Sequence, residues 1–271
     1  MGGGGYVAGP AGVAALSLGL PLVLTEADRH LGLANRALAS RARRVCLAFP
    51  IPGRDGDRYR VTGRPVPPAI LEADRDAARR RFGIDSVERC LLVFGGSQGA
   101  RSLNLMALAA FAGDGRAPTA SRRNFHVIHV SGRRDYAEVK ARLDRAENLD
   151  RYTLLEYEPT LADPLAACDL VLARAGGSIL EMAAAGKPAI LVPYPHAAGR
   201  HQHANADWMA AAGAAVVIHD SDLAPCRLTS TVAGLLADQR RLERMSAASA
   251  ALARPGAAGA IAGEILAAAR P

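Results

Sequence analysis

Apolar runs of strand length recur along this chain, separated by glycine-rich turns and by stretches with helical periodicity. A short continuous apolar run between turn signals is typical of a strand that is buried on both faces of a parallel sheet. Such runs predict strands at Leu22–Leu24, Arg43–Ala48, Arg89–Phe94, Phe125–Val130, Tyr152–Glu156, Leu170–Ala173, Ala189–Val192 and Ala214–Ile218.

The intervening stretches predict helices bounded by glycine and proline. One helix begins near Ala100, and another runs from Ser178 to a stop at Gly186-Lys187-Pro188. The other predicted helices are Gly12–Leu18, Gly32–Ala39, Ala69–Arg81, Asp135–Glu147, Leu161–Ala167, one completed by Asp207–Ala212, Leu228–Leu236, Arg240–Ala253 and Ala257–Ala269. Because strand and helix alternate from residue 90 to 192, the pattern predicts an α/β fold with a doubly wound parallel sheet.

The segment Val7–Leu24 is nearly uncharged and long enough to raise the question of a membrane span. Gly9-Pro10 and Gly19-Leu20-Pro21 are expected to break it into a short helix and a strand. No positively charged region precedes it, which argues against a signal peptide. We therefore expect a cytosolic protein, peripheral to the membrane at most.

The chain has 271 residues, a net charge of +7 and a sequence pI near 9.7. No basic cluster is interleaved with aromatic residues, as nucleic-acid surfaces usually require, so no nucleic-acid partner is expected. The positive charge suits an anionic membrane surface or a pyrophosphate ligand. Arginines scattered over a solvated surface explain the net positive charge equally well.

The four cysteines form no C-x-x-C pair. Buried free thiols in a reducing cytosol are therefore favoured over disulfides or a zinc site. The residues concerned are Cys46, Cys90, Cys168 and Cys226.

The stretch with the most chemical information runs from Asp169 to Asn205 and predicts strand, glycine turn, helix, strand and polar loop. Gly176-Gly177 lets the backbone turn sharply and approach a ligand closely. A glycine turn that feeds a helix N-terminus binds phosphates in α/β proteins, because free N–H groups and the helix dipole point there. Glu181 lies in the first turn of that helix, where a carboxylate can accept hydrogen bonds from the two vicinal hydroxyls of a ribose.

The same spacing has a purely structural interpretation. Ser178-x-x-Glu181 is also a capping box, which satisfies two N–H groups at a helix start and needs no ligand. The spacing alone does not choose between capping and ligand binding.

Two further glycine loops and a histidine group complete the candidate chemistry. Gly95–Ala100 follows a predicted strand and precedes a helix, whereas no strand precedes the glycines of Met1–Gly5. His126 and His129 are expected in the core or at a sheet edge. His196, His201 and His203 form an H-x4-H-x-H pattern that is not a recognised zinc spacing, so no metal site is predicted.

Four motifs in this order resemble the MurG family, the GT-B glycosyltransferases that act in peptidoglycan synthesis. They are GGGGYVAGP at 2–10, GLANRAL at 32–38, GGSQGAR at 95–101, and ARAGGSILEMAAAGKPAILVPYPH at 173–196 followed by HQxxNA. The resemblance covers nearly the whole chain. The family, however, opens with a strand and a GGTGGH-type loop that precede the first residue here.

The resemblance implies an inverting transfer of N-acetylglucosamine from UDP-N-acetylglucosamine to the 4-hydroxyl of lipid I. It implies no metal or other cofactor, because helix N-termini and loop amides would stabilise the leaving UDP. The implied partners are UDP-N-acetylglucosamine, lipid I and the inner face of the cytoplasmic membrane, on which the protein would be peripheral.

The resemblance also implies a set of substrate-binding residues. It places the uracil pocket near Tyr157-Glu158 and makes His201-Gln202 the pair that faces the donor sugar. The full set of implied binding residues is Gly96, Ser97, Gln98, Arg174, Gly177, Ser178, Glu181, His201, Gln202 and Asp28.

Several positions depart from the family pattern. Thr25-Glu26-Ala27-Asp28 stands where HEQN is common, and Asp28 accepts hydrogen bonds but cannot donate as an amide does. A family arginine falls on Pro67, with Arg64 nearby as a substitute, and Arg200 stands where an acid often precedes the HQ pair. The family's candidate base is a histidine of the absent first loop, so we name no catalytic residue in this chain, and Glu26 is a poor substitute.

The expected organisation is GT-B, with a doubly wound donor domain and a truncated N-terminal Rossmann-like domain. Residues 1–66 form the partial acceptor-side domain, 67–250 bind the donor, and 251–271 form a helix that returns toward the N-terminal domain. One alternative is a UDP-sugar-binding module that is inactive alone or needs a separate N-terminal subunit. Another is a different GT-B enzyme such as a UDP-N-acetylglucosamine 2-epimerase, which GGGGYVAGP and GGSQGAR argue against.

Overall fold

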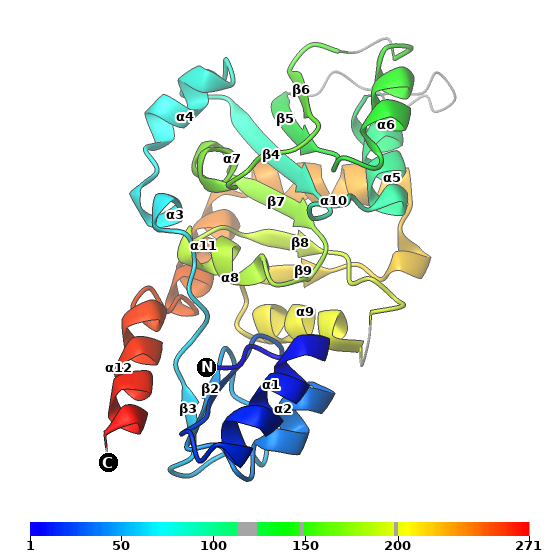
Figure 1. Cartoon of the computed structure of the whole chain (residues 1–271). Helices are drawn as coiled ribbons and strands as arrows, with labels where there is room; N and C mark the ends of the chain where they lie inside the picture. Colours follow the sequence, from blue (N-terminus) through cyan, green and yellow to red (C-terminus); the bar gives the residue numbers. More distant parts are fainter. Residues whose placement is uncertain (113–123, 147–148, 198–199, 271) are drawn as a thin grey trace. The chain divides into compact units, whose positions relative to one another are not determined.

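The computed structural model describes residues 1–112, 124–146, 149–197 and 200–270, and its backbone separates into two compact units (Figure 1). The smaller unit consists of Met1–Val66 together with Ala253–Pro271, and the larger unit is Pro67–Leu252. Each unit has its own parallel sheet and its own apolar cluster. Each thus meets the description of a domain with a separate core.

The larger unit is built on a six-stranded sheet with the order β6-β5-β4-β7-β8-β9, in which every neighbouring pair is parallel. The chain enters at β4, winds outward through β5 and β6, and then returns to β7 beside β4. The predicted doubly wound parallel sheet is therefore confirmed, with its topological switch point between β4 and β7. The strands are β4 (Arg89–Phe94), β5 (Phe125–Val130), β6 (Tyr152–Leu155), β7 (Leu170–Ala173), β8 (Ala189–Leu191) and β9 (Ala215–Val217).

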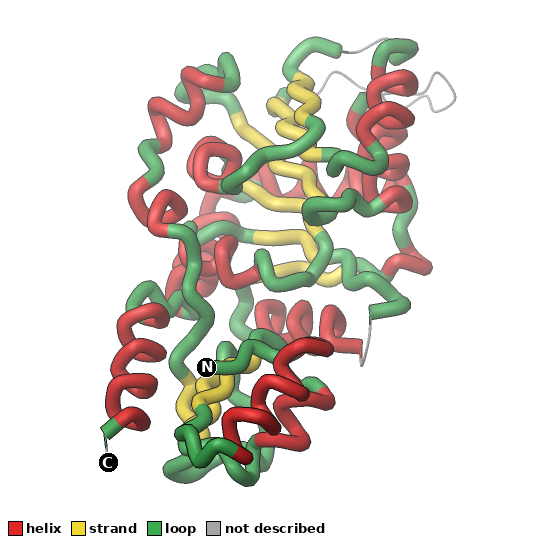
Figure 2. The backbone as a smooth tube through the Cα atoms, in the orientation of Figure 1, coloured by secondary structure: helices red, strands yellow, loops and turns green. Residues whose placement is uncertain are grey.

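The central strands of this sheet are buried on both faces, and Figure 2 shows them flanked by helices. Successive side chains of a strand point to opposite faces, so a strand covered on both sides must be apolar throughout. Leu91 and Val93 join a cluster with residues of α5 (Arg101–Phe111), α10 (Pro225–Ala237) and α11 (Gln239–Ala251). This two-sided burial explains why the apolar runs alone predicted these strands.

The predicted single helix Ala69–Arg81 is wrong, because the segment forms two short helices, α3 (Pro68–Glu72) and α4 (Arg75–Arg81). Ala73 between them is extended, and the Asp74 side chain accepts a 2.6 Å hydrogen bond from the Ala77 amide, which caps α4. The segment is also not simply a solvated basic face. The Arg79 side chain is 3% exposed, and its guanidinium donates to backbone carbonyls of Asp85, Glu88 and Ala167.

The remaining helices of the larger unit follow the predictions with shifted ends. They are α6 (Tyr136–Leu143), α7 (Ala162–Ala167), α8 (Ile179–Ala184) and α9 (His201–Ala211). The predicted α8 stop is confirmed: Gly186 has φ 61°, and the Lys187 amide donates to the Met182 carbonyl at 2.9 Å, as in a Schellman motif. The end predicted for α6 at Glu147 lies outside the described residues.

The smaller unit holds a three-stranded parallel sheet, β1-β2-β3. Its strands are β1 (Val23–Glu26), β2 (Arg44–Leu47) and β3 (Tyr59–Val61), and its helices are α1 (Gly5–Ser17), α2 (Leu33–Leu38) and α12 (Ala257–Ala269). The sequence pattern predicted no strand at β3. Ile261 and Ala268 of α12 pack on Val23 and Cys46 of the sheet, so the C-terminal helix belongs to this unit.

The predicted break at Gly9-Pro10 is absent, because Pro10 lies inside α1. A proline removes only one intrahelical hydrogen bond, and the first helical break comes at Gly19. Met1–Gly5 is not a free loop either: the Gly2 amide donates to the Val23 carbonyl at 2.9 Å, which places residue 2 beside β1. Across the described residues, no helix combines the length and apolarity needed to cross a bilayer.

The four cysteines are free thiols, as predicted. Cys46, Cys90 and Cys168 are buried, whereas Cys226 in α10 is exposed, which corrects the prediction for that residue. Burial raises the pKa of the Cys168 thiol to about 11, so this group stays protonated at neutral pH.

Candidate functional site

A cavity of about 410 Å³ opens at the switch point of the larger sheet, where the loops after β4 and β7 diverge. Open α/β sheets bind ligands at this place, outside the carboxyl ends of the strands. Its walls come from the loops after β4, β5, β7 and β8 and from the start of α9. They consist of Gly95, Gly99, Ala100, Arg101, Ser102, Arg134, Arg174, Tyr194 and Gln202.

The loop after β4 turns on glycines that no other residue could replace without strain. Gly96 has φ 97° and Gly99 has φ 87°, and the Gly99 amide donates to the Gly96 carbonyl at 2.9 Å. This turn exposes Ser97 and Gln98 at the carboxyl edge of the sheet. Both predicted binding residues therefore lie at the tip of a rigid turn, next to the cavity wall.

The loop after β5 presses directly on this turn. A Cβ atom at Gly132 would overlap the backbone of Gly99, so the two loops approach at backbone distance. The next residues supply a cation to the cavity: the Arg134 Nε donates to Asp135 at 2.8 Å, and Asp135 is buried. Sequence reasoning missed Arg134, whose only signal was its place just after the Ser131-Gly132 pair that follows β5.

A buried polar chain supports these two loops from below. Asn104 of α5 donates to the Ser131 carbonyl at 2.9 Å and to the Asp135 carboxylate at 3.0 Å, and its amide oxygen lies 3.0 Å from His129 Nε2. His129 Nδ1 lies 2.7 Å from the Tyr152 hydroxyl. Burial lowers the pKa of His129 to about 3, so the ring is neutral at pH 7. The prediction of a core role for His129 is confirmed.

The loop after β7 carries the predicted binding residues Arg174, Gly177 and Ser178, and the first turn of α8 carries Glu181. The loop backbone is tied at the Ala175 carbonyl, which accepts a 3.1 Å hydrogen bond from the buried Asn205 amide of α9. The Ser178 side chain makes no capping bond, and its φ and ψ are already helical. The capping-box interpretation is therefore wrong for Ser178, because an N-cap residue needs an extended backbone to fold its hydroxyl over the helix end.

The Arg174 side chain is buried, and its guanidinium is engaged by several groups of the protein. Its side chain is 8% exposed and lies 2.6 Å from the Asp220 carboxylate. The guanidinium also donates to the Val192 and Pro193 carbonyls at 3.1 and 3.3 Å and to the Ser102 hydroxyl at 2.6 Å. Asp220 had no sequence signal, since it follows β9 and lies far along the chain from Arg174.

The first turn of α9 completes the cavity wall. His201 and Gln202 were predicted in a polar loop, but they begin the helix. The Gln202 amide oxygen accepts a 2.9 Å hydrogen bond from the Tyr194 amide, which leaves its NH2 group as the remaining donor. His203 stacks on His219 with ring centroids 6.0 Å apart. The pKa of His203 is lowered, mainly by burial and in addition by the nearby positive charges of Arg200 and His219.

Two predicted features lie at the margin or outside this site. Tyr157 of the predicted uracil pocket is covered by the Arg133 guanidinium, 3.8 Å from the ring centroid, and Glu158 pairs with Arg81 at 2.9 Å. Asp28 belongs to the smaller unit, where its amide donates to the Glu26 carboxylate at 3.2 Å. Of the predicted binding residues, Arg174 and Gln202 line the cavity, and the others of the larger unit lie in the segments that follow β4, β7 and β8.

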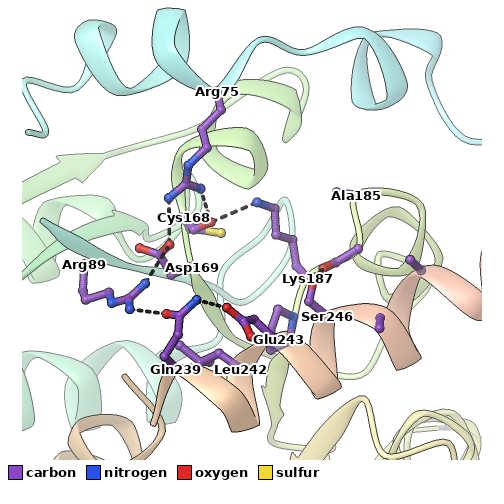
Figure 3. A pocket seen from close by; sticks show the side chains of 14 residues that line it. Arg75, Arg89, Cys168, Asp169, Ala185, Lys187, Gln239, Leu242, Glu243 and Ser246 are labelled. Carbon is purple, nitrogen blue, oxygen red and sulfur yellow. Dashed lines mark hydrogen bonds and ion pairs between the residues drawn. The ribbon is translucent and has the colours of Figure 1, made fainter. Parts of the chain in front are cut away.

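A second cavity of about 410 Å³ lies at the amino ends of β4 and β7 in the same unit (Figure 3). Its charged groups are engaged with one another or with carbonyls. Arg75 pairs with Asp169 at 2.7 Å, and Lys187 donates to the Cys168 carbonyl at 3.0 Å. Arg89 contacts Gln239, which donates to Glu243. These contacts tie α4, α8 and α11 to the sheet, and the cavity lies away from the ligand edge of the fold.

The fold and the cavity define an α/β protein with a glycine-rich switch point, the place at which open α/β sheets bind ligands. Residues 90–261 match the glycosyltransferase family 28 C-terminal domain, and residues 1–47 match the family 28 N-terminal domain. The chain belongs to glycosyltransferase family 28 and, within it, to the MurG family. The predicted recognition, enzyme class and GT-B fold are confirmed.

Relatives with the same name support this assignment across the whole chain. The UDP-N-acetylglucosamine–N-acetylmuramyl-(pentapeptide) pyrophosphoryl-undecaprenol N-acetylglucosamine transferase of Moorella thermoacetica is 43% identical over 270 residues, which cover 96% of this chain and 71% of the relative. The transferase of that name from Rubrobacter xylanophilus is 36% identical, and the match covers 100% of this chain and 77% of that relative.

Solved structures agree on the fold. The crystal structure of Acinetobacter baumannii MurG superposes with a TM-score of 0.77 at 28% identity, over 97% of this chain and 72% of that one. The UDP-GlcNAc 2-epimerase of Neisseria meningitidis, bound to UDP-GlcNAc, has a TM-score of 0.65 at 14% identity, over 98% of this chain and 75% of that one. At that identity the epimerase shows a shared fold alone, and the MurG relatives decide the family.

Proposed function

We propose that this chain transfers N-acetylglucosamine from UDP-N-acetylglucosamine to the 4-hydroxyl of lipid I, the undecaprenyl-pyrophosphoryl N-acetylmuramyl-pentapeptide, with inversion. The observation that carries the proposal is the 43% identity to a transferase of that name over 96% of the chain. The comparisons do not favour the alternative of a binding module without enzymatic activity.

The cavity at the switch point supports binding of a nucleotide diphosphate-sugar. Glycine turns after β4 and β7 bring backbone N–H groups to a ligand at close range. Arg101 and Arg134 line the cavity; they pair with Glu138 and Asp135 at 2.8 Å, and their remaining N–H groups can donate to a pyrophosphate. The Gln202 NH2 group is placed to donate to a sugar hydroxyl. Preorganised donors of this kind stabilise the negative charge that develops on a leaving UDP.

The Glu26 carboxylate at the end of β1 is already engaged by backbone and side-chain N–H donors. Glu26 accepts four N–H donors: the amides of Ala27, Asp28 and Gly32, and the Asn35 side chain. A carboxylate that accepts four N–H donors holds the loop between β1 and α2 together. We therefore assign Glu26 a loop-organising role and assign no base.

The smaller unit has an apolar surface that supports a peripheral position on the inner face of the cytoplasmic membrane. Helix α1 carries no charged residue, and Val7, Val13 and Leu18 are 82%, 60% and 73% exposed. Leu33 at the start of α2 is 74% exposed. Exposed apolar patches of this kind mark membrane or protein contacts. Sedimentation with anionic lipid vesicles tests this part, and no binding at low salt would contradict it.

The decisive test of the function is transfer from UDP-N-acetylglucosamine to a lipid I analogue by this chain, with calorimetric binding of the donor on the same sample. Turnover establishes the transferase. Donor binding without turnover supports the donor site but contradicts the claim that the chain suffices for transfer. Absence of both contradicts the proposed function.

A Glu181→Gln variant is expected to bind UDP more weakly by about ten- to a hundredfold. Losing a charged hydrogen bond to ribose hydroxyls costs roughly 1.5–3 kcal/mol, and each 1.4 kcal/mol is tenfold in Kd. Calorimetry with UDP measures the change. The exposed Glu243→Gln variant in α11 is the matched control, and equal UDP affinity in both variants and the parent chain would leave Glu181 without a binding role.

A further inference from the structure

Asp220, just after β9, is the carboxylate that pairs with the buried Arg174. The Asp220 Oδ1 lies 2.6 Å from Arg174 Nη1 and accepts a 3.2 Å hydrogen bond from the Ser102 hydroxyl. The Arg174 residue as a whole is 7% exposed. Leaving one partner of such a buried pair without the other is strongly destabilising, because the remaining charge is poorly solvated. The orientation of the Arg174 guanidinium therefore depends on Asp220.

Arg174 in turn holds the loop that follows β8. Its guanidinium donates to the Val192 and Pro193 carbonyls, the last backbone positions before Tyr194. It also lies 5.5 Å from the centroid of the Tyr194 ring, within range of a cation–π contact. Arg174 thus holds this loop at its backbone and at its first aromatic side chain.

The same loop sets the position of Gln202. The Tyr194 amide donates to the Gln202 amide oxygen at 2.9 Å, so the backbone of Tyr194 fixes which way the Gln202 amide faces. Arg174, Tyr194 and Gln202 are three of the residues that line the cavity. A continuous series of contacts therefore runs from Asp220 through Arg174 and Tyr194 to the Gln202 NH2 group.

We propose that Asp220 is a positioning residue for recognition of the sugar of the nucleotide donor, acting through Arg174 on the loop that carries Tyr194 and orients Gln202. This inference rests on the proposed function, since it concerns the same cavity. The glycine turns after β4 and β7, which would face a diphosphate, have supports of their own: the Gly99 amide donates to the Gly96 carbonyl at 2.9 Å, and the Asn205 side chain donates to the Ala175 carbonyl at 3.1 Å. Loss of Asp220 therefore weakens sugar recognition more than diphosphate recognition.

The test compares the Kd of UDP-N-acetylglucosamine with the Kd of UDP in the parent chain and in Asp220→Asn. We expect the Kd of the nucleotide-sugar to rise about tenfold, which is the value of one well-placed hydrogen bond, and the Kd of UDP to change less than about threefold. The ratio of the two constants is the informative quantity. General destabilisation lowers the thermal midpoint and affects both ligands alike.

Asp222→Asn is the matched control, because Asp222 lies two residues away and pairs with Arg227 at 3.2 Å on the surface. It is expected to leave both constants unchanged. Should Asp220→Asn not fold, Asp220→Glu serves the same comparison. It keeps the negative charge but lengthens the side chain that positions the Arg174 guanidinium, so a shift in ratio in the same direction is expected.

The possible outcomes separate this inference from the proposed function. A parent chain that binds neither ligand contradicts the proposed function itself. A parent chain that binds both, with variants that lose both affinities equally or neither, overturns the role of Asp220. A shift in the ratio in an Asp220 variant, absent in Asp222→Asn, supports it.

Discussion

A Gly132→Ala substitution is expected to lower the free energy of unfolding of the larger unit by about 2–5 kcal/mol and to abolish measurable binding of UDP-N-acetylglucosamine. Gly132 has φ 84°, a conformation that costs a residue with a side chain roughly 1–2 kcal/mol. The added Cβ would also overlap the Gly99 backbone, and relieving such a clash costs about 1–3 kcal/mol more. The only relief is to move the loop that presents Ser97.

Gly96→Ala separates the two contributions to this loss. Gly96 has φ 97°, but a Cβ there meets nothing within 4 Å, so only the conformational cost of roughly 1–2 kcal/mol applies. Urea unfolding followed by the fluorescence of Trp208, the single tryptophan, reports on the larger unit. Equal losses in the two variants would show that contact between the loops contributes nothing.

The sheet of the larger unit could be predicted because its central strands β4, β5, β7 and β8 are buried on both faces. Residues such as Leu91, Leu92 and Val93 have no exposed surface, so the chain has to be apolar without alternation, and that pattern is visible in the sequence. The split between α3 and α4 was not visible, since the apolar periodicity continues across Ala73. The deciding feature is the Asp74 cap, a local hydrogen bond that competes with a continuous helix.

The short edge strand β3 escaped prediction for a related reason. Its Tyr59, Arg60 and Val61 are at most half-buried, so the segment lacks the apolar run that marked the other strands. Backbone pairing with β2 places it in the sheet, and the Arg60 guanidinium lies 3.7 Å from Glu264 of α12 in the same unit. Pairing and charge contacts between distant segments leave little trace in a local pattern.

The glycine turns of the site were predictable, whereas their supports were not. Gly96 and Gly177 stand in loops that directly follow apolar runs, so their place at the carboxyl edge follows from the strand pattern. Asp220 and Asn104 reach the site from other elements, and each acts on a residue remote in sequence. Arg174 was predicted at the site. Its pairing with Asp220 shows that its positive charge is engaged within the protein.

A buried series of hydrogen bonds runs from Tyr152 through His129 and Asn104 to Asp135. It is expected to make the free energy of unfolding of the larger unit depend on pH. Asn104 uses its NH2 group toward Ser131 and Asp135, so its oxygen faces His129 and the Nε2 atom of the ring carries the proton. The Nδ1 atom then accepts from the Tyr152 hydroxyl. A second proton would create a charge at a side chain with no exposed surface, and this desolvation lowers the pKa of His129 to about 3.

The larger unit is accordingly expected to lose stability as the pH falls from 6.5 toward 3. Above pH 6.5 neither state binds the extra proton at His129, and the full stability is present. Below 6.5 the unfolded state binds it and the folded state does not, so this group costs about 1.4 kcal/mol per pH unit. At pH 4.5 the loss is roughly 2.7 kcal/mol. Urea unfolding by Trp208 fluorescence between pH 7 and about 4 measures it.

A His129→Gln variant removes this contribution and its pH dependence together. We expect it to be less stable at pH 7, since Gln cannot contact both Asn104 and Tyr152, but to have a shallower slope by about 1.4 kcal/mol per unit below pH 6.5. His196→Gln, at an exposed ring that contacts only Tyr194 in the described structure, is the control and should keep the parent slope. Parallel slopes in the parent chain and His129→Gln would mean that His129 takes up its proton in the folded state. The neutral chain from Tyr152 to Asp135 would then not exist in solution.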